Sequence, residues 1–549
     1  MEILTAAQMN AIDRDSGERG VPVRVLMENA GEAVAWFCRE RYPGLLAVVL
    51  CGKGNNGGDG AVAARLLAEI QTPVKLVLLG SIEETKGDAA AALARAKATK
   101  RVEFIEVSDE AALREALKGA DLIVDAVVGT GFKPPLRGLA AVARDLIAAV
   151  NKPVVAVDLP SGWDADSTAQ TSKDENGVAQ AFRADAVVTF VAPKMAHVFG
   201  HLTPGKTFGP VVVAQIGTPV ESMPARTELH WTGTAKRLTE RPRNVDGNKG
   251  KFGHVLIVGG SLGKSGAPSM ASVAAMRAGA GLTTAAVPRS VLPTVAAVAP
   301  ELMSMPLEET NGLSFEQLGE ETLTELLKGM TVVGIGPGLG QEGTTPEFVR
   351  AFVERVSLPM VIDADALNAL AGKVELLKRI ASATDANGRK RTIVLTPHPG
   401  EMARLVESSV KEVEADRIGL ARRFATENGV TLVLKGWRTL VAHPDGRVAV
   451  NTTGNPGMAK GGSGDILTGI VAAMLAQYPE QVSEAVEAAV FLHGLAADFA
   501  TLTQDEHTVL ATDTVDHLWQ AFRARVEDED GLTWITGLAG FSGSGSHDA

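Results

Sequence analysis

Short hydrophobic runs recur along the chain, and polar or amphipathic stretches separate them. In the first half they lie at 45–51, 74–79, 122–127, 154–158, 186–191 and 211–215. In the second half they lie at 254–258, 332–335, 360–362, 392–395 and 431–434, followed by helical periodicity from 465 to about 525. Alternation of this kind predicts parallel sheets covered by helices. The predicted fold class is therefore α/β in both halves, with a doubly wound sheet in the first.

The same patterns predict the domain boundaries. Two amphipathic helices, at 6–14 and 23–41, precede the first strand and are expected to cover one sheet edge or to form a dimer contact. A stretch with three prolines and no long apolar element then indicates a linker. An acidic run and a Gly/Ser-rich end indicate a disordered tail. The predicted organisation is a first domain at 1–220, a linker at 221–244, a second domain at 245–525 and a tail at 526–549.

Composition narrows the possible functions. At 549 residues the chain is too long for one core, and its net charge of −12 argues against a nucleic-acid partner. Cys38 and Cys51 are the only cysteines, so neither a disulfide framework nor a cysteine-based zinc site is supported. Residues 1–5 do not begin a signal peptide, and no apolar run approaches the length of a membrane span. A cytoplasmic enzyme without a membrane partner is expected.

The segment 455–465 consists mainly of small residues and leads into an apolar helix. Gly461, Gly462 and Gly464 allow the backbone to approach an anion, and the first N–H groups of a helix attract phosphate. Asp465 in the first turn can take a proton from an attacking hydroxyl group. The segment alone indicates either a phosphate site or a tightly packed helix start.

A glycine-rich segment at 52–60 satisfies G-x-G-x-x-G between a predicted strand and a predicted helix. The next strand ends in Gly80-Ser81, not in the acid that holds a ribose hydroxyl in an NAD site. Asp125 and Asp158 end later strands, and parallel strands bring such ends to one crevice. For each acid taken alone, a turn former at a strand end is the favoured interpretation, and several such groups together favour a site.

These segments, Gly-Asn-Asn-Gly-Gly-Asp-Gly at 54–60, 125–131, 158–162 and Ala-Pro-Lys at 192–194, resemble the NAD(P)H-hydrate epimerase domain over nearly all of 1–220. The resemblance implies a Rossmann-like fold that interconverts the two epimers of hydrated NADH or NADPH. It implies K⁺ binding by Asn56, Asp125 and Ser161, an oxygen set that suits a hard cation. The implied hydrate-binding residues are Asn55, Asn56, Gly57, Gly58, Asp59, Gly129, Thr130, Gly131, Phe132, Lys133, Pro134, Pro135 and Asp158. We expect Asp125 to act as acid or base, and Lys194 to be either a second catalytic group or a solvated loop lysine.

The second half contains a glycine-rich segment, 259–265, that is one residue too short for a P-loop. Together with 249–254, 336–340, 363–368, 396–401, 435–436 and 455–465, it resembles the NAD(P)H-hydrate dehydratase domain, which is ribokinase-like. An epimerase domain followed by this domain is the layout of bifunctional NAD(P)H-hydrate repair enzymes.

This second resemblance implies that ADP or ATP phosphorylates the ring hydroxyl of the S hydrate and that elimination restores NAD(P)H. Asp465 would activate the hydroxyl, and Mg²⁺ would accompany the nucleotide. The implied hydrate-binding residues are Ala267, Gly338, His398 and Asp465, although His398 between two prolines could be a turn residue. The implied nucleotide-binding residues are Lys435, Gly436, Trp437, Arg438, Thr439 and Gly464.

Two other functions fit the fold. One is a ribokinase-superfamily small-molecule kinase with a regulatory dinucleotide-binding domain, and the other is a binding protein whose first domain has lost catalysis. The block 396–401 and the epimerase-like half favour repair over the kinase, and the intact polar set of the first half argues against the binding protein. The expected partners are hydrated NADH or NADPH and ADP or ATP, in a homo-oligomer.

Overall fold

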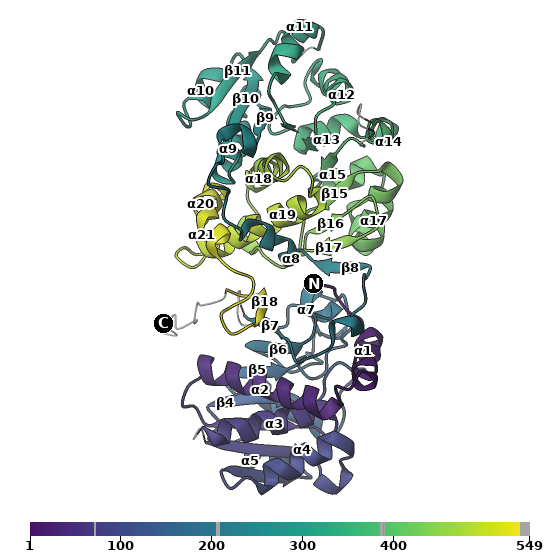
Figure 1. Ribbon diagram of the computed structural model, residues 1–549, viewed down its shortest axis with the longest axis vertical. Coiled ribbons are helices and arrows are strands. Elements are labelled where there is room, and N and C mark those ends of the chain that lie inside the picture. Colours follow the sequence, from purple (N-terminus) through teal and green to yellow (C-terminus); the bar gives the residue numbers. More distant parts are fainter. Residues whose placement is uncertain (71–72, 205–208, 314, 385–387, 389, 539–549) are drawn as a thin grey trace. The chain divides into compact units, whose positions relative to one another are not determined.

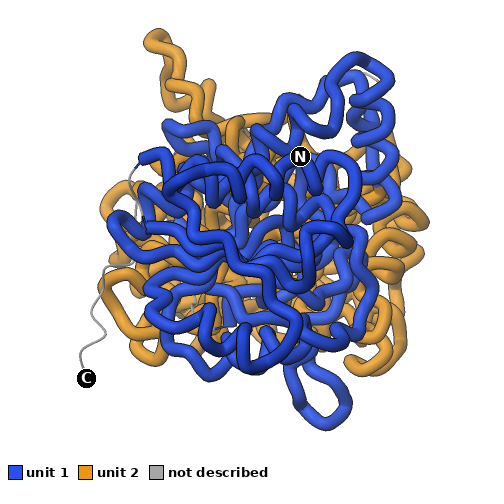
Figure 2. The backbone as a smooth tube through the Cα atoms, turned by 90° about the horizontal axis from the view of Figure 1, so that it is seen from below, with its two compact units in different colours: residues 1–227, 526–549 blue, residues 228–525 orange. Residues whose placement is uncertain are grey.

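The computed structural model describes residues 1–70, 73–204, 209–313, 315–384, 388 and 390–538. The chain forms two compact units. Unit 1 contains residues 1–227 and 526–549, and unit 2 contains residues 228–525 (Figure 2). Both units are α/β, which confirms the predicted fold class. No helix in the described ranges is long and apolar enough to cross a membrane.

Unit 1 is built on an eight-stranded sheet in which every strand except β18 is parallel to its neighbours. In sheet order the strands are β18 (Thr533–Thr536), β7 (Val211–Ala214), β6 (Ala186–Phe190), β5 (Val154–Val157), β4 (Leu122–Ala126), β1 (Ala47–Cys51), β2 (Val74–Leu79) and β3 (Val102–Val107). The strand order reverses between β1 and β4, and a crevice for ligands opens at the carboxyl ends of strands at such a point. The edge strand β3 was not predicted, because its glutamates interrupt the apolar pattern on its exposed positions.

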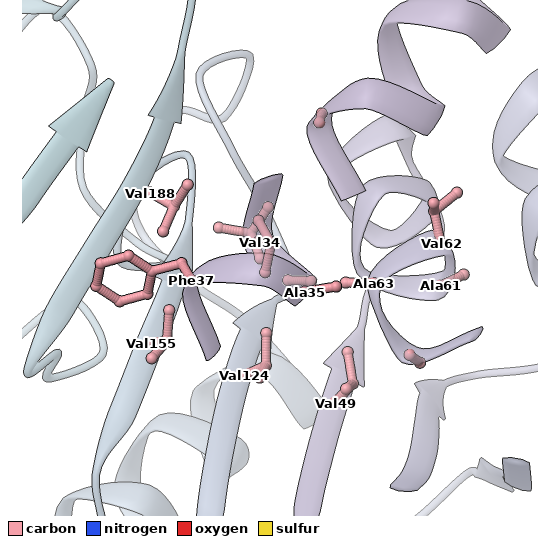
Figure 3. Packing of buried hydrophobic residues seen from close by; sticks show 14 of the residues in the cluster. Val34, Ala35, Phe37, Val49, Ala61, Val62, Ala63, Val124, Val155 and Val188 are labelled. Carbon is pink, nitrogen blue, oxygen red and sulfur yellow. The ribbon is translucent and has the colours of Figure 1, made fainter. Parts of the chain in front are cut away.

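Helices cover both faces of this sheet, and a hydrophobic core lies on each. The helices are α1 (Ala6–Glu18), α2 (Val23–Arg41), α3 (Asn55–Glu69), α4 (Gly87–Ala98), α5 (Glu110–Ala116), α6 (Leu139–Ala148) and α7 (Met195–Phe199) (Figure 1). Figure 3 shows side chains of α2 and α3 over valines of the central strands: Val34, Ala35, Phe37, Ala61, Val62, Ala63, Val49, Val124, Val155 and Val188. The expectation that the helix at 23–41 lies at a sheet edge is wrong, since this helix packs on a face.

Helix α3 begins at Asn55, inside the glycine segment and six residues before the predicted start. The reason is close packing. A Cβ atom on Gly60 would lie 2.4 Å from the Ala126 side chain of β4, and one on Gly57 would lie 1.9 Å from the Gly52 carbonyl oxygen. The glycines therefore let the first two turns of α3 lie against β4 and the preceding loop.

The prediction of a disordered tail at 526–549 is wrong for the first part of that segment. Residues 533–536 form β18, which pairs antiparallel with the edge strand β7. Leu532 and Trp534 are 5% and 7% exposed and belong to the core of unit 1. The Trp534 indole donates a hydrogen bond to Asp528 at 2.7 Å. This apolar segment follows an acidic run and covers an otherwise free sheet edge. The Gly/Ser-rich end at 542–546 lies outside the described residues.

Trp534→Ala should lower the free energy of unfolding of unit 1 by about 3 kcal/mol, because it removes a buried aromatic side chain from a packed core. Chemical denaturation of the full chain, compared with Trp519→Ala, measures the effect. Trp519 is 58% exposed, so its loss should change stability by less than about 0.5 kcal/mol. Equal effects of the two substitutions would contradict the placement of β18 in the core.

Unit 2 is built on a ten-stranded sheet that is parallel from β11 to β15 and then contains antiparallel neighbours. In sheet order the strands are β11 (Met303–Leu307), β10 (Leu282–Pro288), β9 (His254–Val258), β12 (Val332–Ile335), β13 (Met360–Ile362), β14 (Ile393–Leu395), β15 (Thr431–Leu434), β16 (Leu440–Ala442), β17 (Val448–Val450) and β8 (Leu229–Trp231). Strands β10, β11, β16 and β17 were not predicted, because they are very short or rich in small side chains.

The prediction of a linker without regular structure at 221–244 is also wrong, because this segment contains β8 and a helix. Strand β8 pairs with β17, and Trp231 is 1% exposed. The helices of unit 2 are α8 (Gly233–Lys236), α9 (Gly266–Arg277), α10 (Leu292–Ala296), α11 (Phe315–Leu327), α12 (Thr345–Arg355), α13 (Ala364–Leu370), α14 (Val374–Ser382), α15 (Pro399–Leu405), α16 (Val410–Ala415), α17 (Arg417–Asn428), α18 (Ser463–Gln477), α19 (Val482–Ala500), α20 (Ala511–Asp516) and α21 (Leu518–Arg523) (Figure 1). Helix α18 packs against α9 and α19.

Candidate active sites

A cavity of about 960 Å³ opens at the carboxyl ends of the strands of unit 1. Of the residues predicted to bind a hydrate, those that line it are Asn55, Asn56, Asp59, Gly129, Thr130, Gly131, Phe132 and Asp158. Gly57, Gly58, Lys133, Pro134 and Pro135 do not line it. Lys133 instead forms ion pairs with Asp164 at 2.7 Å and Asp166 at 3.1 Å.

Asp158 lies in the wall of this cavity, and its carboxylate is saturated with hydrogen bonds. Oδ2 accepts from the Thr130 N–H at 2.8 Å and from the Thr130 hydroxyl at 2.5 Å. Oδ1 accepts from Thr189 at 2.9 Å and from Lys194 Nζ at 3.0 Å. Burial alone would raise the pKa of Asp158, but the positive charge of Lys194 and these hydrogen bonds hold the pKa below its ordinary value. Asp158 is therefore a permanent anion in the cavity wall and a poor base.

Lys194 is 1% exposed, so the alternative of a solvated loop lysine is wrong. Its ammonium group has three acceptors: Asp158 at 3.0 Å, Thr189 at 2.8 Å and the Phe190 carbonyl oxygen at 3.2 Å. His197 accepts from the Lys194 N–H through Nδ1 at 2.9 Å and contacts the Asp158 carbonyl oxygen through Nε2 at 2.7 Å. This contact supports the left-handed backbone of Asp158, whose φ is 66°.

Asp125 is fully buried and does not line the cavity. Its carboxylate accepts from the Ser161 N–H at 2.7 Å, the Ser161 hydroxyl at 2.6 Å and the Val127 N–H at 3.2 Å. Burial raises the pKa of Asp125 to about 7, against the opposite effect of these hydrogen bonds. The geometry favours a role in holding the loops after β4 and β5 over the predicted proton exchange with substrate.

In unit 2, Lys435 follows β15 and joins several segments predicted to form the second site. Its Nζ donates to Asp363 Oδ1 at 2.9 Å and lies 3.8 Å from Glu401 Oε2. A Cβ atom on Gly464 would lie 3.2 Å from the same Nζ. Burial would lower the pKa of Lys435, but the charges of Asp363 and Glu401 outweigh it and raise the pKa. A cation is thus held beside the first turn of α18.

Asp465 lies in that first turn. Burial and the charge of Asp363 raise the pKa of Asp465 to about 7, while Lys435 acts to lower it. Thr468, one turn later, donates to Asp363 Oδ2 at 2.8 Å and fixes the start of α18 against β13. A carboxyl group with a pKa near neutrality suits a general base at physiological pH.

The loop that precedes α18 is held by buried polar groups from α19. Asp498 accepts from the Gly454 N–H and from the Asn455 side chain, both at 3.0 Å, and burial raises its pKa to about 7. His493 is buried near Ser463, and this burial lowers its pKa to about 4. Gly462 has a φ of 100°, a conformation that glycine adopts without strain.

The predicted hydrate-binding residues of unit 2 come from separate loops. His398 caps α15 by accepting from the Gly400 N–H at 3.0 Å, and its Nε2 lies 3.4 Å from Glu401. Its side chain is 51% exposed, so it keeps a free face besides its role in the turn. A Cβ atom on Gly338 would lie 3.1 Å from the Ala267 side chain, which places these two residues together.

The predicted nucleotide-binding segment after β15 forms a loop with an aromatic surface. The Arg438 guanidinium lies 4.3 Å from the centre of the Trp437 ring, and its Nη1 donates to the Thr452 carbonyl oxygen at 2.5 Å. Trp437 is 40% exposed. The Thr439 hydroxyl donates to the Gly436 carbonyl oxygen at 3.3 Å. An exposed ring beside cationic side chains can bind a nucleotide base.

Sequence reasoning missed the central role of Asp363. This residue follows the apolar run of β13 directly, and an acid at the carboxyl end of a parallel strand is a usable signal for a site. It also missed Asp13 of α1, which lines the cavity of unit 1. Nothing in an amphipathic helix pattern distinguishes that aspartate from a solvated one.

Across the described residues, one group could hold a metal ion through at least three side chains: His230, His443 and Glu487. Both imidazoles contact the same Glu487 oxygen, at 2.8 and 2.9 Å. The three side chains thus form a hydrogen-bonded clamp between β8, the end of β16 and α19, in which His443 Nδ1 has no hydrogen-bond partner among the described residues. Neither predicted site includes any of these residues.

Gly464→Val should raise the KM for the nucleotide by about tenfold or more, the equivalent of one lost charge-assisted hydrogen bond. The new side chain would occupy the space next to Lys435 Nζ, whose flexible end can move without disturbing the core. Steady-state kinetics with ADP and ATP measure the effect. Ala415→Val on α16 is the matched control, because Ala415 is exposed and lies outside both sites. Equal kinetics in both variants would remove the anion site from the start of α18.

Comparison with known proteins covers both halves of the chain. A family profile described as NAD(P)H-hydrate dehydratase matches residues 255–520, and one described as YjeF-related protein N-terminus matches residues 23–196. A crystal structure of the ADP/ATP-dependent NAD(P)H-hydrate dehydratase from Bacillus subtilis, co-crystallised with ATP and Mg²⁺, matches at 30% identity with a TM-score of 0.44. That match covers 55% of this chain and 99% of the other.

Two relatives match almost from end to end. The bifunctional NAD(P)H-hydrate repair enzyme of Moorella thermoacetica is 40% identical over 542 residues, which cover 96% of this chain and 98% of that protein. The enzyme of the same name from Thermofilum pendens is 36% identical over 538 residues, with 96% and 97% covered. Identity at this level over the whole length shows that the chain belongs to the bifunctional NAD(P)H-hydrate repair enzymes, which combine an epimerase with a dehydratase.

Proposed function

We propose that the two activities of this family are divided between the two units. Unit 1 interconverts the R and S epimers of hydrated NADH and NADPH in its 960 Å³ cavity. Unit 2 dehydrates the S epimer at the start of α18. The observation that carries the assignment of unit 2 is the placement of Lys435 Nζ beside Gly464, directly before the acidic residue Asp465.

The dehydration step follows from this geometry. The first N–H groups of α18 and the Lys435 ammonium group bind the phosphate that ADP or ATP transfers. Asp465 takes the proton of the ring hydroxyl as that oxygen attacks, and the resulting phosphate ester is a good leaving group. Phosphate leaves from the carbon bonded to the ring nitrogen, the adjacent ring carbon gives up a proton to water, and the C=C bond that forms restores the reduced nicotinamide. Mg²⁺ would enter with the nucleotide and neutralise phosphate charge.

The donor set of unit 1 fits the K⁺ ion that the family resemblance implies. Asp125 Oδ1 lies 2.6 Å from Ser161 Oγ, which in turn lies 3.1 Å from the Val128 carbonyl oxygen. A Cβ atom on Gly129 would lie 3.0 Å from Asn56 Oδ1, so the loop after β4 passes close to that amide. Hard oxygen ligands of this kind suit an alkali cation. Bound there, K⁺ would hold the loops around the cavity and neutralise Asp125.

The test supplies a mixture of hydrate epimers with ADP or ATP and follows the return of the absorbance of reduced nicotinamide. The absorbance should return completely when ADP or ATP is present and should not return without nucleotide. Removal of K⁺ should slow only the phase limited by epimerisation. Accumulation of a phosphorylated product that is released unchanged would instead identify a small-molecule kinase. Failure to consume the R epimer faster than its spontaneous conversion would exclude epimerisation by this chain.

A further inference from the structure

The cavity of unit 1 contains two carboxyl groups that differ from all others around it. Asp13 of α1 and Asp59 of α3 both line the cavity. Neither carboxylate accepts a hydrogen bond from another described residue, whereas Asp158 accepts four. A carboxyl group that faces a ligand cavity and has no protein partner is available to exchange a proton with the ligand. Asp125 and Asp158 are not available in this way.

A second observation indicates that this end of the cavity meets a ligand. The Asn56 side chain is 9% exposed and lines the cavity, yet its Nδ2 has no hydrogen-bond partner among the described residues. Buried amide donors are nearly always paired, so an orphan that faces a cavity points to a ligand atom. Asn56 and Asp59 lie one turn apart in α3.

The two carboxyl groups also differ in their electrostatic surroundings. Burial and the charge of Asp158 raise the pKa of both groups, and Lys194 opposes this. The charge of Asp13 adds to the effect at Asp59, whose pKa is raised well above its ordinary value. The other charged groups of the lining are Lys53, Glu84 and Arg137. Two neighbouring carboxyl groups whose proton affinities are driven apart are suited to act as acid and base in one reaction.

We propose that Asp59 and Asp13 are the catalytic acid and base of the epimerase, a role that rests on the proposed function of unit 1. Hydration of NAD(P)H places the hydroxyl group on a carbon bonded to the ring nitrogen. The acid, Asp59, gives its proton to this hydroxyl, the C–O bond breaks, and water leaves while the nitrogen lone pair forms a C=N⁺ bond. Water then adds to the opposite face of that carbon, and Asp13 takes the proton that this water loses.

This reaction conserves protons, charge and oxidation state. One proton moves from Asp59 to the leaving oxygen and one from the entering water to Asp13, so the site returns to its total charge and no redox partner is required. The reverse reaction exchanges the roles of the two groups. The Asp158 carboxylate, kept anionic by Lys194, stabilises the cationic intermediate between the two steps. The hydroxyl oxygen of the product therefore comes from solvent.

The experiment uses the full-length chain with Asp13→Asn, Asp59→Asn and the double variant. Epimer exchange is followed chromatographically without nucleotide. Chemical denaturation of each variant is the control for the folding of unit 1, and dehydration of the S epimer with ADP reports on unit 2. We expect kcat for epimerisation to fall by about 10²-fold or more in each single variant, with a KM within about threefold of wild type. The double variant should be at most about threefold slower than the slower of the two single variants, because the two groups act as a unit.

Asp15→Asn on α1 and Glu69→Gln on α3 are matched controls, because both side chains are exposed on the same helices, and their rates should equal that of wild type. In H₂¹⁸O, each inversion by the wild type should introduce one ¹⁸O atom into the hydrate. Inversion without ¹⁸O, or a kcat within threefold of wild type in either single variant, would overturn the proposal. If the wild-type chain itself does not exchange the epimers, the proposed function of unit 1 fails instead.

Discussion

Asp465→Asn should abolish nucleotide-dependent dehydration and leave the interconversion of the hydrate epimers unchanged. A neutral amide of the same size cannot take the proton of the ring hydroxyl, and loss of a general base costs about 10²–10⁴-fold in rate. Asparagine and aspartate have similar helix propensities, so the fold of α18 should persist. Return of reduced-nicotinamide absorbance from the S epimer with ADP measures the effect.

The matched control for this prediction is Glu375→Gln. Glu375 is an exposed acid in the first turn of α14, outside both sites, so its neutralisation reports the general cost of removing such a charge from unit 2. Near wild-type dehydration by Asp465→Asn would show that Asp465 only caps a helix. Loss of both activities together would show that the substitution unfolds more than the site.

Lys435→Met should lower kcat/KM for the nucleotide by about 10²–10³-fold, because it removes the cation beside the phosphate position. It should also change the pH dependence. In the wild type, dehydration should fall as the pH drops below about 7, because Asp465 then takes up a proton and is lost as a base. Lys435 lowers the pKa of Asp465, so its removal should move this acid limb to higher pH.

The pH–rate profile of S-epimer dehydration, measured at saturating nucleotide, tests the direction of this shift. Lys411→Met on α16 is the control, because Lys411 is an exposed lysine outside both sites. An acid limb that stays in place while activity falls would separate Lys435 from the titration of Asp465. A limb that moves to lower pH would contradict the charge arrangement of the site.

Stability and catalysis depend on different residues in unit 1. Trp534 of β18 closes a sheet edge far along the chain from the glycine segment, whereas Asp13 and Asp59 face the cavity. Substitution of Trp534 should change the unfolding transition, and substitution of Asp13 or Asp59 should change only the rate of epimerisation. Chemical denaturation and the rate of epimer exchange, measured on the same variants, test this distinction.

The sequence by itself determined the α/β class, most central strands and the glycine segments at both sites. Central parallel strands are buried on both faces, so they are continuous apolar runs such as Val154–Val157 and Thr431–Leu434. Glycine segments are recognisable because close approach of backbone to backbone or to a phosphate excludes side chains locally. The acids that end such strands, Asp158 and Asp363 among them, could be placed at a sheet end from the same pattern.

Only the tertiary structure decided which polar groups face a ligand and which hold the fold. Edge strands such as β3, β8 and β18 are short or half-exposed, so their pairing depends on partners distant in sequence. Asp125 and Asp59 both stand in glycine-rich motifs, yet one is saturated by Ser161 and the other faces the cavity. Asp13 reaches the same cavity from a helix without any motif. Burial and hydrogen bonding are properties of the packed chain, and they decide the role of a carboxyl group after the residue type has been set.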